Sequence, residues 1–372
     1  MNKIKQYAVI GVFFLFICGF SIAHFILPDN KFSAEERKNL TQVPTLTWEA
    51  IRTGDYFAEG ETYLLDQFPL RSQFLDAKRF LDKNVFLMDS TGGYANVGDH
   101  LTDLKPSQTL KEDQVQHAVN IFNKIISAHP ESSRVFFSII PDKNYYLTQL
   151  TGQPYLDYEK LQEIADGIQG EKISVDHLLS LEDYYYTDSH WKQEEIIPVA
   201  EALCDAMDVP VPDSGKYYAT TLEGFKGIYF HLAGTDPEAE ELVYLRSDAI
   251  DNAVVSHLTN NMQTEKIEMY TEEKIDKEFS DSYDVYLNGP ESMITIENPN
   301  ATTSKHLIMI RDSFGSALAP LLVDSYAKIT ILDLRYLKST YFSAAKVDFT
   351  DADLLFLCST TMLNNARNLG LQ

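Results

Sequence analysis

Residues 306–316 read HLIMIRDSFGS, and this stretch decides the fold that the sequence predicts. Its first five residues form a short apolar run, which is typical of a strand buried on both faces of a sheet. A polar turn follows at 311–313, and a helix is expected from about Phe314. A residue between a parallel strand and a helix N-terminus lies at the edge of the sheet where ligands bind. Ser313 is therefore the first candidate for chemistry.

Other segments repeat this pattern and extend the prediction to a whole domain. Short apolar strands are expected at 134–140, 328–332 and 353–357, and helices at 111–129, 158–168, 191–207, 314–325 and about 337–345. Strands that alternate with helices predict an α/β fold with a parallel sheet covered on both faces. Pro198 is expected to kink its helix. Residues 212–300 are acidic and interrupt the alternation, so we interpret them as a mixed, β-rich insertion over one end of the sheet.

The N-terminal residues 1–28 differ from the rest of the chain. The run 7–27 contains no charged side chain, and at ~1.5 Å per residue it spans about 30 Å, enough to cross a bilayer. Lys3 and Lys5 precede it and acidic residues follow, which favours a cytoplasmic N-terminus and an extracytoplasmic remainder. We predict a single-pass membrane anchor, then a membrane-proximal tether and helical segment at 29–105. The alternative is a signal peptide cleaved near residue 23, which would secrete the remainder.

Composition excludes several classes of protein. A chain of 372 residues with 44% hydrophobic residues has enough apolar material for a globular core. Its net charge of −24 argues against a nucleic-acid partner held by a basic patch. Three cysteines, at 18, 204 and 358, are expected to be free thiols. The nine histidines form no HxH or HExxH pair, so no metal site is expected.

A second stretch, YYYTDSHW at 184–191, can supply the partners of a nucleophilic serine. Asp188 and His190 are two residues apart, so in an extended loop both side chains point to the same side. The carboxylate can then hold Nδ1 of the imidazole and leave Nε2 free as a base. Together with Ser313, the pair satisfies the requirement of a serine hydrolase or acyltransferase for a nucleophile, a base and an orienting group.

Simpler explanations exist for both stretches. A Ser or Asp before a helix is commonly an N-cap, worth about 1 kcal/mol, and this alone would account for Asp312-Ser313 and Asp188-Ser189. An Asp-x-His pattern can also be half of a metal site. Ser316 is a competing nucleophile on the same turn. Spacing alone leaves these alternatives open.

Several ordered motifs resemble the DHHW and alginate O-acetyltransferase-like group of exported proteins. They are ERKNL at 36–40 with Pro44, YLLDQFPLR at 63–71, TDSHW at 187–191, FKG at 225–227 and RDSF at 311–314. The resemblance implies a circularly permuted SGNH-hydrolase-like fold, with a flavodoxin-like parallel sheet, for a catalytic domain at 106–372. It also implies a triad of Asp188, His190 and Ser313. The name-giving middle His is Ser189 here, but its side chain should face away from the other two, so we expect the triad to survive.

The same resemblance implies an extracytoplasmic O-acyltransferase, with acetyl as the expected group, that modifies a cell-surface or exported polysaccharide without a cofactor. Because acyl-CoA is cytoplasmic, it also implies a polytopic membrane O-acyltransferase that supplies the acyl group. Further candidates for substrate binding or for the oxyanion hole are Arg311, Gly227, Trp191, Lys143 and Tyr186. Tyr145 and Tyr146, like the aromatic residues at 184–191, can stack on sugars, although aromatic-rich segments more often form core.

Two other functions stay open at this point. One is a carbohydrate acetylesterase, because transfer and hydrolysis differ only in whether a sugar or water reaches the acyl-enzyme. The other is a non-catalytic surface assembly protein with the same fold.

Overall fold

The computed structural model describes residues 3–33, 38–86, 90–91, 94–97, 100–103, 109–151, 155–230, 237–275 and 281–369. Residues 36 and 37 of the ERKNL motif lie outside these ranges. The chain divides into two compact units, Met1–Gly92 and Gly93–Gln372. This boundary lies before the one that the sequence suggested at residues 105 and 106.

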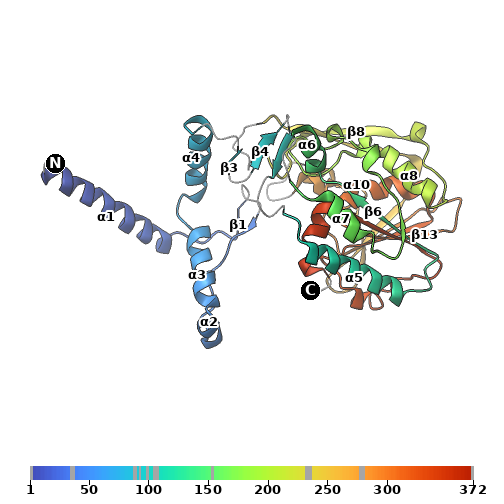
Figure 1. Ribbon diagram of the computed structural model, residues 1–372, viewed down its shortest axis with the longest axis horizontal. Helices are drawn as coiled ribbons and strands as arrows, with labels where there is room; N and C mark the ends of the chain where they lie inside the picture. Colours follow the sequence, from blue (N-terminus) through green and yellow to red (C-terminus); the bar gives the residue numbers. More distant parts are fainter. Residues whose placement is uncertain are drawn as a thin grey trace. The chain divides into compact units, whose positions relative to one another are not determined.

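The N-terminal unit is mainly helical (Figure 1). Its elements are α1 (Lys3–Ile26), β1 (Phe32–Ser33), β2 (Lys38–Asn39), α2 (Trp48–Thr53), α3 (Asp55–Asp66), α4 (Arg71–Asn84) and β3 (Ser90–Thr91). Helix α1 is long and apolar enough to cross a membrane. Near its C-terminal end, Phe20 stacks on Phe68 with the ring centroids 5.3 Å apart. Pro69 lies between α3 and α4.

Two side chains of the YLLDQFPLR motif hold the segment that precedes α2. Asp66 accepts hydrogen bonds from the backbone N–H and the hydroxyl of Thr41, at 3.0 and 2.9 Å. Gln67 donates to the carbonyls of Asn30 and Thr41, at 2.8 and 3.0 Å. His24 of α1 lies 3.2 Å from the carbonyl of Gln67. The residues predicted as a tether are therefore attached to the helical unit at several points.

The second unit is built on an eight-stranded sheet in the described part of the chain, with strand order β11-β10-β12-β14-β13-β15-β6-β7. Its strands are β6 (Arg134–Ile140), β7 (Glu171–Lys172), β10 (Val254–Leu258), β11 (Thr264–Lys266), β12 (Met293–Glu297), β13 (His306–Arg311), β14 (Lys328–Leu332) and β15 (Asp353–Ser359). Strands β14, β13, β15, β6 and β7 run parallel to one another. The other three pair antiparallel. Both edge strands, β7 and β11, are very short and exposed.

Helices cover both faces of the parallel part of the sheet (Figure 1). Along β13, Leu307 and Met309 contribute to one hydrophobic core, and Ile308 and Ile310 contribute to the other. The first core includes α8 (Ile197–Ala206) and α10 (Phe314–Leu318), and the second includes α5 (Glu112–Ala128), α7 (Tyr158–Ala165) and α11 (Thr360–Asn364). The predicted α/β class, with helices on both faces of the sheet, is confirmed.

The remaining helices and strands lie beside this layered core. They are β4 (Tyr94–Val97), β5 (His100–Asp103), α6 (Lys143–Thr151), β8 (Tyr218–Phe225), β9 (Glu240–Arg246) and α9 (Asp248–Asn252). Strands β8 and β9 pair antiparallel outside the main sheet.

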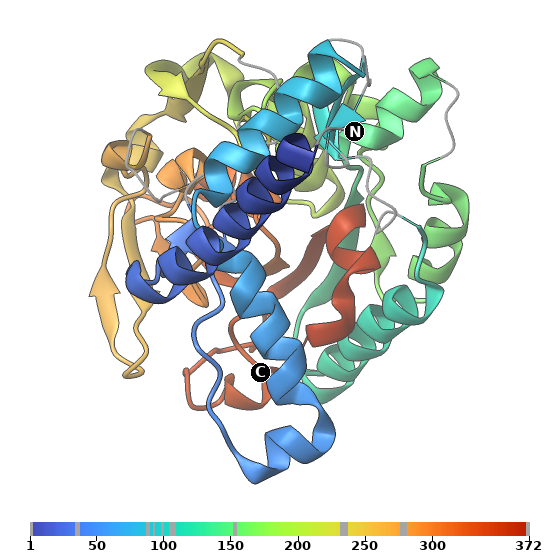
Figure 2. The same cartoon turned by 90° about the vertical axis from the view of Figure 1, so that its left-hand side faces the viewer.

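Four local predictions were wrong. Residues 212–300 do not only cover one end of the sheet, because β10, β11 and β12 extend the sheet itself; their hairpin lies at one edge, in gold (Figure 2). The helix predicted at 191–207 begins only at Ile197. Pro198 occupies its first turn, where the missing N–H costs no hydrogen bond, so no kink results. The segment at 337–345 contains a single 3-10 turn, Ser339–Tyr341, in place of a helix.

Candidate active site

Ser313 directly follows β13 and stands at the N-cap position of α10, with φ −59° and ψ −24°. Its side chain makes no capping hydrogen bond. The Oγ atom lies 2.7 Å from Nε2 of His190 instead. Asp312 provides the cap, because its Oδ1 accepts from the N–H of Phe314 at 3.2 Å and its Oδ2 accepts from the N–H and hydroxyl of Ser359. The N-cap explanation therefore applies to Asp312 and not to Ser313.

His190 lies between Ser313 and Asp188. Its Nδ1 is 2.5 Å from Oδ1 of Asp188, and the same oxygen accepts the backbone N–H of His190 at 2.9 Å. The second oxygen, Oδ2, accepts from the N–H of Ile228 at 2.7 Å. An ionised carboxylate only accepts, so Nδ1 carries the proton and Nε2 is left to accept from the serine hydroxyl. The structure thus joins the three residues predicted from the sequence in one chain of hydrogen bonds.

The surroundings of His190 favour its charged form. Burial disfavours a charge on either residue, but the close contact between them outweighs this cost, so the pKa of Asp188 is lowered and the pKa of His190 is raised. Tyr283 stacks on the imidazole with the ring centroids 3.9 Å apart and the planes 7° from parallel. This stacking fixes the plane of the ring and leaves both nitrogens in line with their partners. An imidazolium formed by taking up the serine proton would be stabilised here.

Lys143 supports the loop that carries Asp188. Its Nζ donates to the carbonyls of Leu101, Tyr185, Tyr186 and Asp188, at 2.7, 2.9, 3.1 and 2.8 Å. The side chain is only 1% exposed, and burial lowers its pKa to about 7, whereas the four carbonyls favour the protonated ammonium. Nζ also lies 5.6 Å from the centroid of the Tyr229 ring. The role in substrate or oxyanion binding given to Lys143 stays a prediction.

Glu240 and Gly227 hold the same loop from the other side. The Glu240 carboxylate accepts from the N–H groups of Tyr186 and Thr187, at 2.6 and 2.7 Å. The N–H of Gly227 donates to the hydroxyl of Thr187 at 3.0 Å, and the oxyanion role given to Gly227 stays a prediction. A Cβ atom at position 227 would overlap the carbonyl of Thr187 and the Cβ of Asp188. Glycine is therefore required for this close approach.

Trp191 and Arg311 are buried next to the serine turn. Trp191 is fully buried, and its Nε1 donates to the carbonyl of Phe314 at 3.1 Å. Arg311 is 1% exposed and pairs with Asp333 at 3.4 Å. Nε and Nη2 of Arg311 are buried and have no hydrogen-bond partner among the described residues. The binding roles given to Trp191 and Arg311 stay predictions.

The remaining predictions near the turn have different outcomes. Ser316 is buried, which excludes the competing nucleophile in this structure. Tyr186 is half-buried and its hydroxyl accepts from Nδ2 of Asn96 at 3.3 Å. Tyr186 stays a candidate for contact with substrate.

Three contributors to the site were not predicted, namely Ile228, Glu240 and Tyr283. All three belong to the segment 212–300, which we interpreted as an insertion. Ile228 directly follows the FKG motif, so that motif was a usable signal. Glu240 and Tyr283 had no local signal, because an acidic residue and a tyrosine in an acidic, tyrosine-containing segment look like their neighbours.

The fold of the chain is similar to that of two solved structures, a DHHW family protein and PatB1. A DHHW family protein from Eubacterium siraeum superposes with a TM-score of 0.61 at 19% sequence identity, covering 75% of this chain and 95% of the other. Bacillus cereus PatB1 with a sulfonyl adduct superposes with a TM-score of 0.59 at 20% identity, covering 73% and 95%. No protein-family model and no curated protein sequence matches the chain. The resemblance inferred from the motifs is confirmed at the level of the fold.

Proposed function

We propose that this protein is an extracytoplasmic O-acyltransferase that moves an acetyl group onto a cell-surface or exported polysaccharide. The observation that carries the proposal is the position of His190, whose two nitrogens contact Asp188 and a serine hydroxyl that caps no helix. The resemblance of the TDSHW and RDSF motifs to acetyltransferase-like proteins, and the shared fold, support the choice of acetyl transfer. The adduct on PatB1 adds support, because sulfonylating reagents react with activated nucleophiles.

The proposed reaction has two halves. In the first, Ser313 Oγ attacks the acyl carbonyl of the donor while Nε2 of His190 takes the hydroxyl proton; the bond to the leaving group breaks, and His190 protonates that group. In the second, a sugar hydroxyl attacks the acyl-enzyme and gives its proton to His190, which returns it to Ser313. Asp188 holds the imidazole and stabilises its charge throughout. The products are the free serine and an acetylated sugar.

The acyl donor and the oxyanion hole follow from the same chemistry. Since acyl-CoA is cytoplasmic, a transferase on the outer side needs a polytopic membrane O-acyltransferase to deliver the acyl group. The backbone N–H of Ser313 is the candidate oxyanion donor, because Gly227 and Ile228 already donate to Thr187 and Asp188.

Replacement of the serine tests the nucleophile. The full-length chain in detergent should release nitrophenol from 4-nitrophenyl acetate and gain the mass of one sulfonyl group from phenylmethylsulfonyl fluoride. Ser313→Ala should lose both activities by at least a hundredfold, the scale expected for removal of a triad nucleophile. Ser316→Ala, the matched control on the same turn, should keep both. Equal rates in wild type and Ser313→Ala would refute the proposed nucleophile.

A second measurement separates transfer from hydrolysis. With an oligosaccharide present, a transferase yields an acetylated sugar by mass spectrometry, and an esterase yields only free acetate. If wild type forms no acetylated sugar while the Ser313-dependent esterase activity persists, the esterase is the correct alternative.

A further inference from the structure

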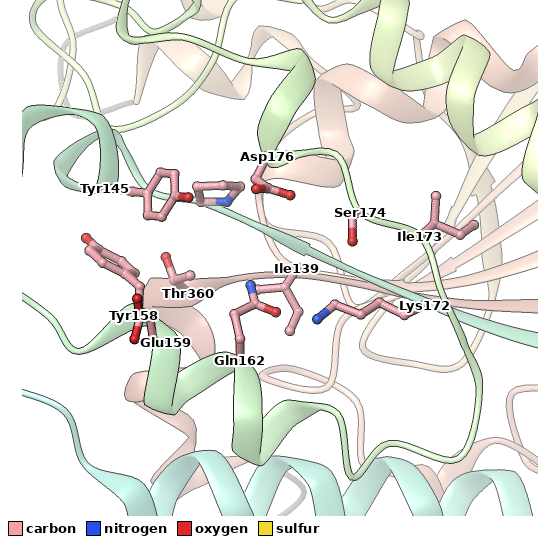
Figure 3. A pocket seen from close by; sticks show the side chains of 11 residues that line it. Ile139, Tyr145, Tyr158, Glu159, Gln162, Lys172, Ile173, Ser174, Asp176 and Thr360 are labelled. Atoms are coloured by element: carbon pink, nitrogen blue, oxygen red, sulfur yellow. The ribbon is translucent and has the colours of Figure 1, made fainter. Parts of the chain in front are cut away.

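A pocket of about 240 Å³ lies between β6, α7 and the segment that follows β7, apart from the Ser313 turn. Tyr145 and Tyr158 lie at one end of it and Lys172 at the other (Figure 3). The rings of Tyr145 and Tyr158 meet edge to face, with centroids 5.1 Å apart. The volume suits one sugar-sized ring rather than a long oligomer. Aromatic walls with a few polar groups are the usual lining of a site for a small polar ring.

The polar lining of this pocket includes two carboxylates and one buried amide oxygen that can accept hydrogen bonds. Oε1 of Gln162 is buried and has no hydrogen-bond partner among the described residues. Within the same described ranges, no hydrogen bond reaches the carboxylates of Glu159 and Asp176, which also line the pocket. Lys172, a cation in the lining, is already paired with Asp166 at 2.7 Å. A ligand with hydroxyl or ammonium donors therefore fits, and a ligand carboxylate would meet negative charge.

The pocket lies on the same edge of the sheet as Ser313. Its residue Thr360 follows β15, the strand next to β13, and the pocket opens beyond β6, the next strand along. Two strand spacings amount to about 10 Å. The Thr360 hydroxyl donates to the buried carboxylate of Asp142 at 2.7 Å, and the Tyr158 hydroxyl donates to it at 3.0 Å. These bonds join two residues of the pocket lining, Thr360 and Tyr158, to Asp142, which follows the carboxyl end of β6.

We propose that this pocket binds one pyranose ring of the polysaccharide and that it prefers an amino sugar to a uronic acid. The ring packs against Tyr145, and its hydroxyl or ammonium donors reach Gln162, Glu159 and Asp176. A polymer held here extends along the sheet edge toward Ser313, which makes the pocket an accessory subsite. Its part in acetyl transfer rests on the proposed function, whereas sugar binding itself does not.

Titration calorimetry on the full-length chain in detergent tests the site with two probes, a β-1,4-linked glucosamine tetramer and a galacturonic acid tetramer. The glucosamine probe should bind, and the galacturonic acid probe should bind at least tenfold more weakly. Tyr145→Ala and Gln162→Leu should each weaken glucosamine binding at least tenfold. Glu159→Gln should reduce the preference between the two probes, because it removes charge and keeps the shape.

Two control variants make the outcome specific. Tyr341→Ala removes a tyrosine that is 51% exposed outside the pocket and should change nothing. Ser313→Ala should keep the affinity for glucosamine, so the pocket can be confirmed even if the proposed acetyl transfer fails. The proposal is overturned if the glucosamine tetramer does not bind at millimolar concentration, or if it binds Tyr145→Ala and Gln162→Leu as well as wild type.

Discussion

His190 combines two properties that a general base in this position needs. Its Nδ1 is held by a carboxylate that burial protects from water, and its Nε2 contacts the serine hydroxyl that it has to activate. The same carboxylate raises the pKa of His190 above the ordinary imidazole value, despite the opposing effect of burial. The neutral imidazole is the form that can accept the serine proton.

The raised pKa of His190 predicts the pH dependence of acylation. As pH falls through that pKa, the imidazole becomes protonated and the rate falls, so the acidic limb should have its midpoint above about 6.5, the value for a free imidazole. The measurement is the pH profile of kcat/KM for 4-nitrophenyl acetate. Asp188→Asn should slow the reaction and move the midpoint down. A midpoint that does not move in this variant would contradict the role given to Asp188.

Lys143 should affect the reaction only by holding the backbone of the loop that carries Asp188. Lys143→Met removes a donor from four carbonyls, of which only that of Tyr186 has another donor among the described residues, the N–H of Leu101, and is expected to lower the free energy of unfolding by about 3 kcal/mol. It should also lower kcat more than it raises KM, because it loosens the loop that carries Asp188. Urea unfolding and steady-state kinetics measure the two effects. The matched control, Lys192→Met, removes a lysine bonded to a single exposed carbonyl and should change stability by less than about 0.5 kcal/mol.

The turn that contains Gly227 packs closely against the loop that carries Asp188. Gly227→Ala should displace this turn, because its Cβ has no space beside the carbonyl of Thr187. We expect a loss of about 2 kcal/mol of stability and at least a tenfold fall in acylation rate, since the N–H of Ile228 would leave Asp188. Thermal unfolding and the aryl acetate assay provide the measurements.

A second glycine serves as the control for that substitution. Gly60 lies in α3, and a methyl group added there would have no neighbouring atom within 4 Å. Gly60→Ala should therefore leave the rate unchanged and raise helix stability by about 0.5 to 1 kcal/mol. If Gly227→Ala behaves like Gly60→Ala, the close approach at residue 227 does not matter for the site.

Elements with strong local patterns could be predicted from the sequence, and elements defined by distant partners could not. The strands β6, β13, β14 and β15 are largely apolar, so their positions were predictable. The short strands β10 and β11 are partly polar and pair with each other, and they join the sheet only because β10 pairs with the distant strand β12. The same distinction holds within the site.

Ser313, His190 and Asp188 are marked by turns and spacing, so sequence could propose them. The position of Lys143 after a strand could also be read from the sequence. Its burial could not, and a buried ammonium that donates to carbonyls positions the backbone, whereas an exposed one can bind a ligand. The stacking of Tyr283 on His190 depends on tertiary packing between segments far apart in the chain.

The N-terminal helix contacts other elements of the N-terminal unit, which bears on the choice between anchor and signal peptide. Cleavage after residue 23 would remove Phe20 and its stacking with Phe68. We therefore expect α1 to be retained. Intact mass spectrometry of protein from carbonate-washed membranes should show the N-terminal residues present. A mature chain that begins at His24 and is found in the medium would show that the signal-peptide alternative is correct.

The two short edge strands of the eight-stranded sheet affect how copies of the chain can associate. Strand β7 is only Glu171–Lys172, and β11 is only Thr264–Lys266, and both are exposed and carry charged side chains. Unpaired strand edges can template aggregation, and short, charged edges prevent a second chain from extending the sheet. These two edges therefore hinder a second copy of the chain from extending the eight-stranded sheet into intermolecular β-structure.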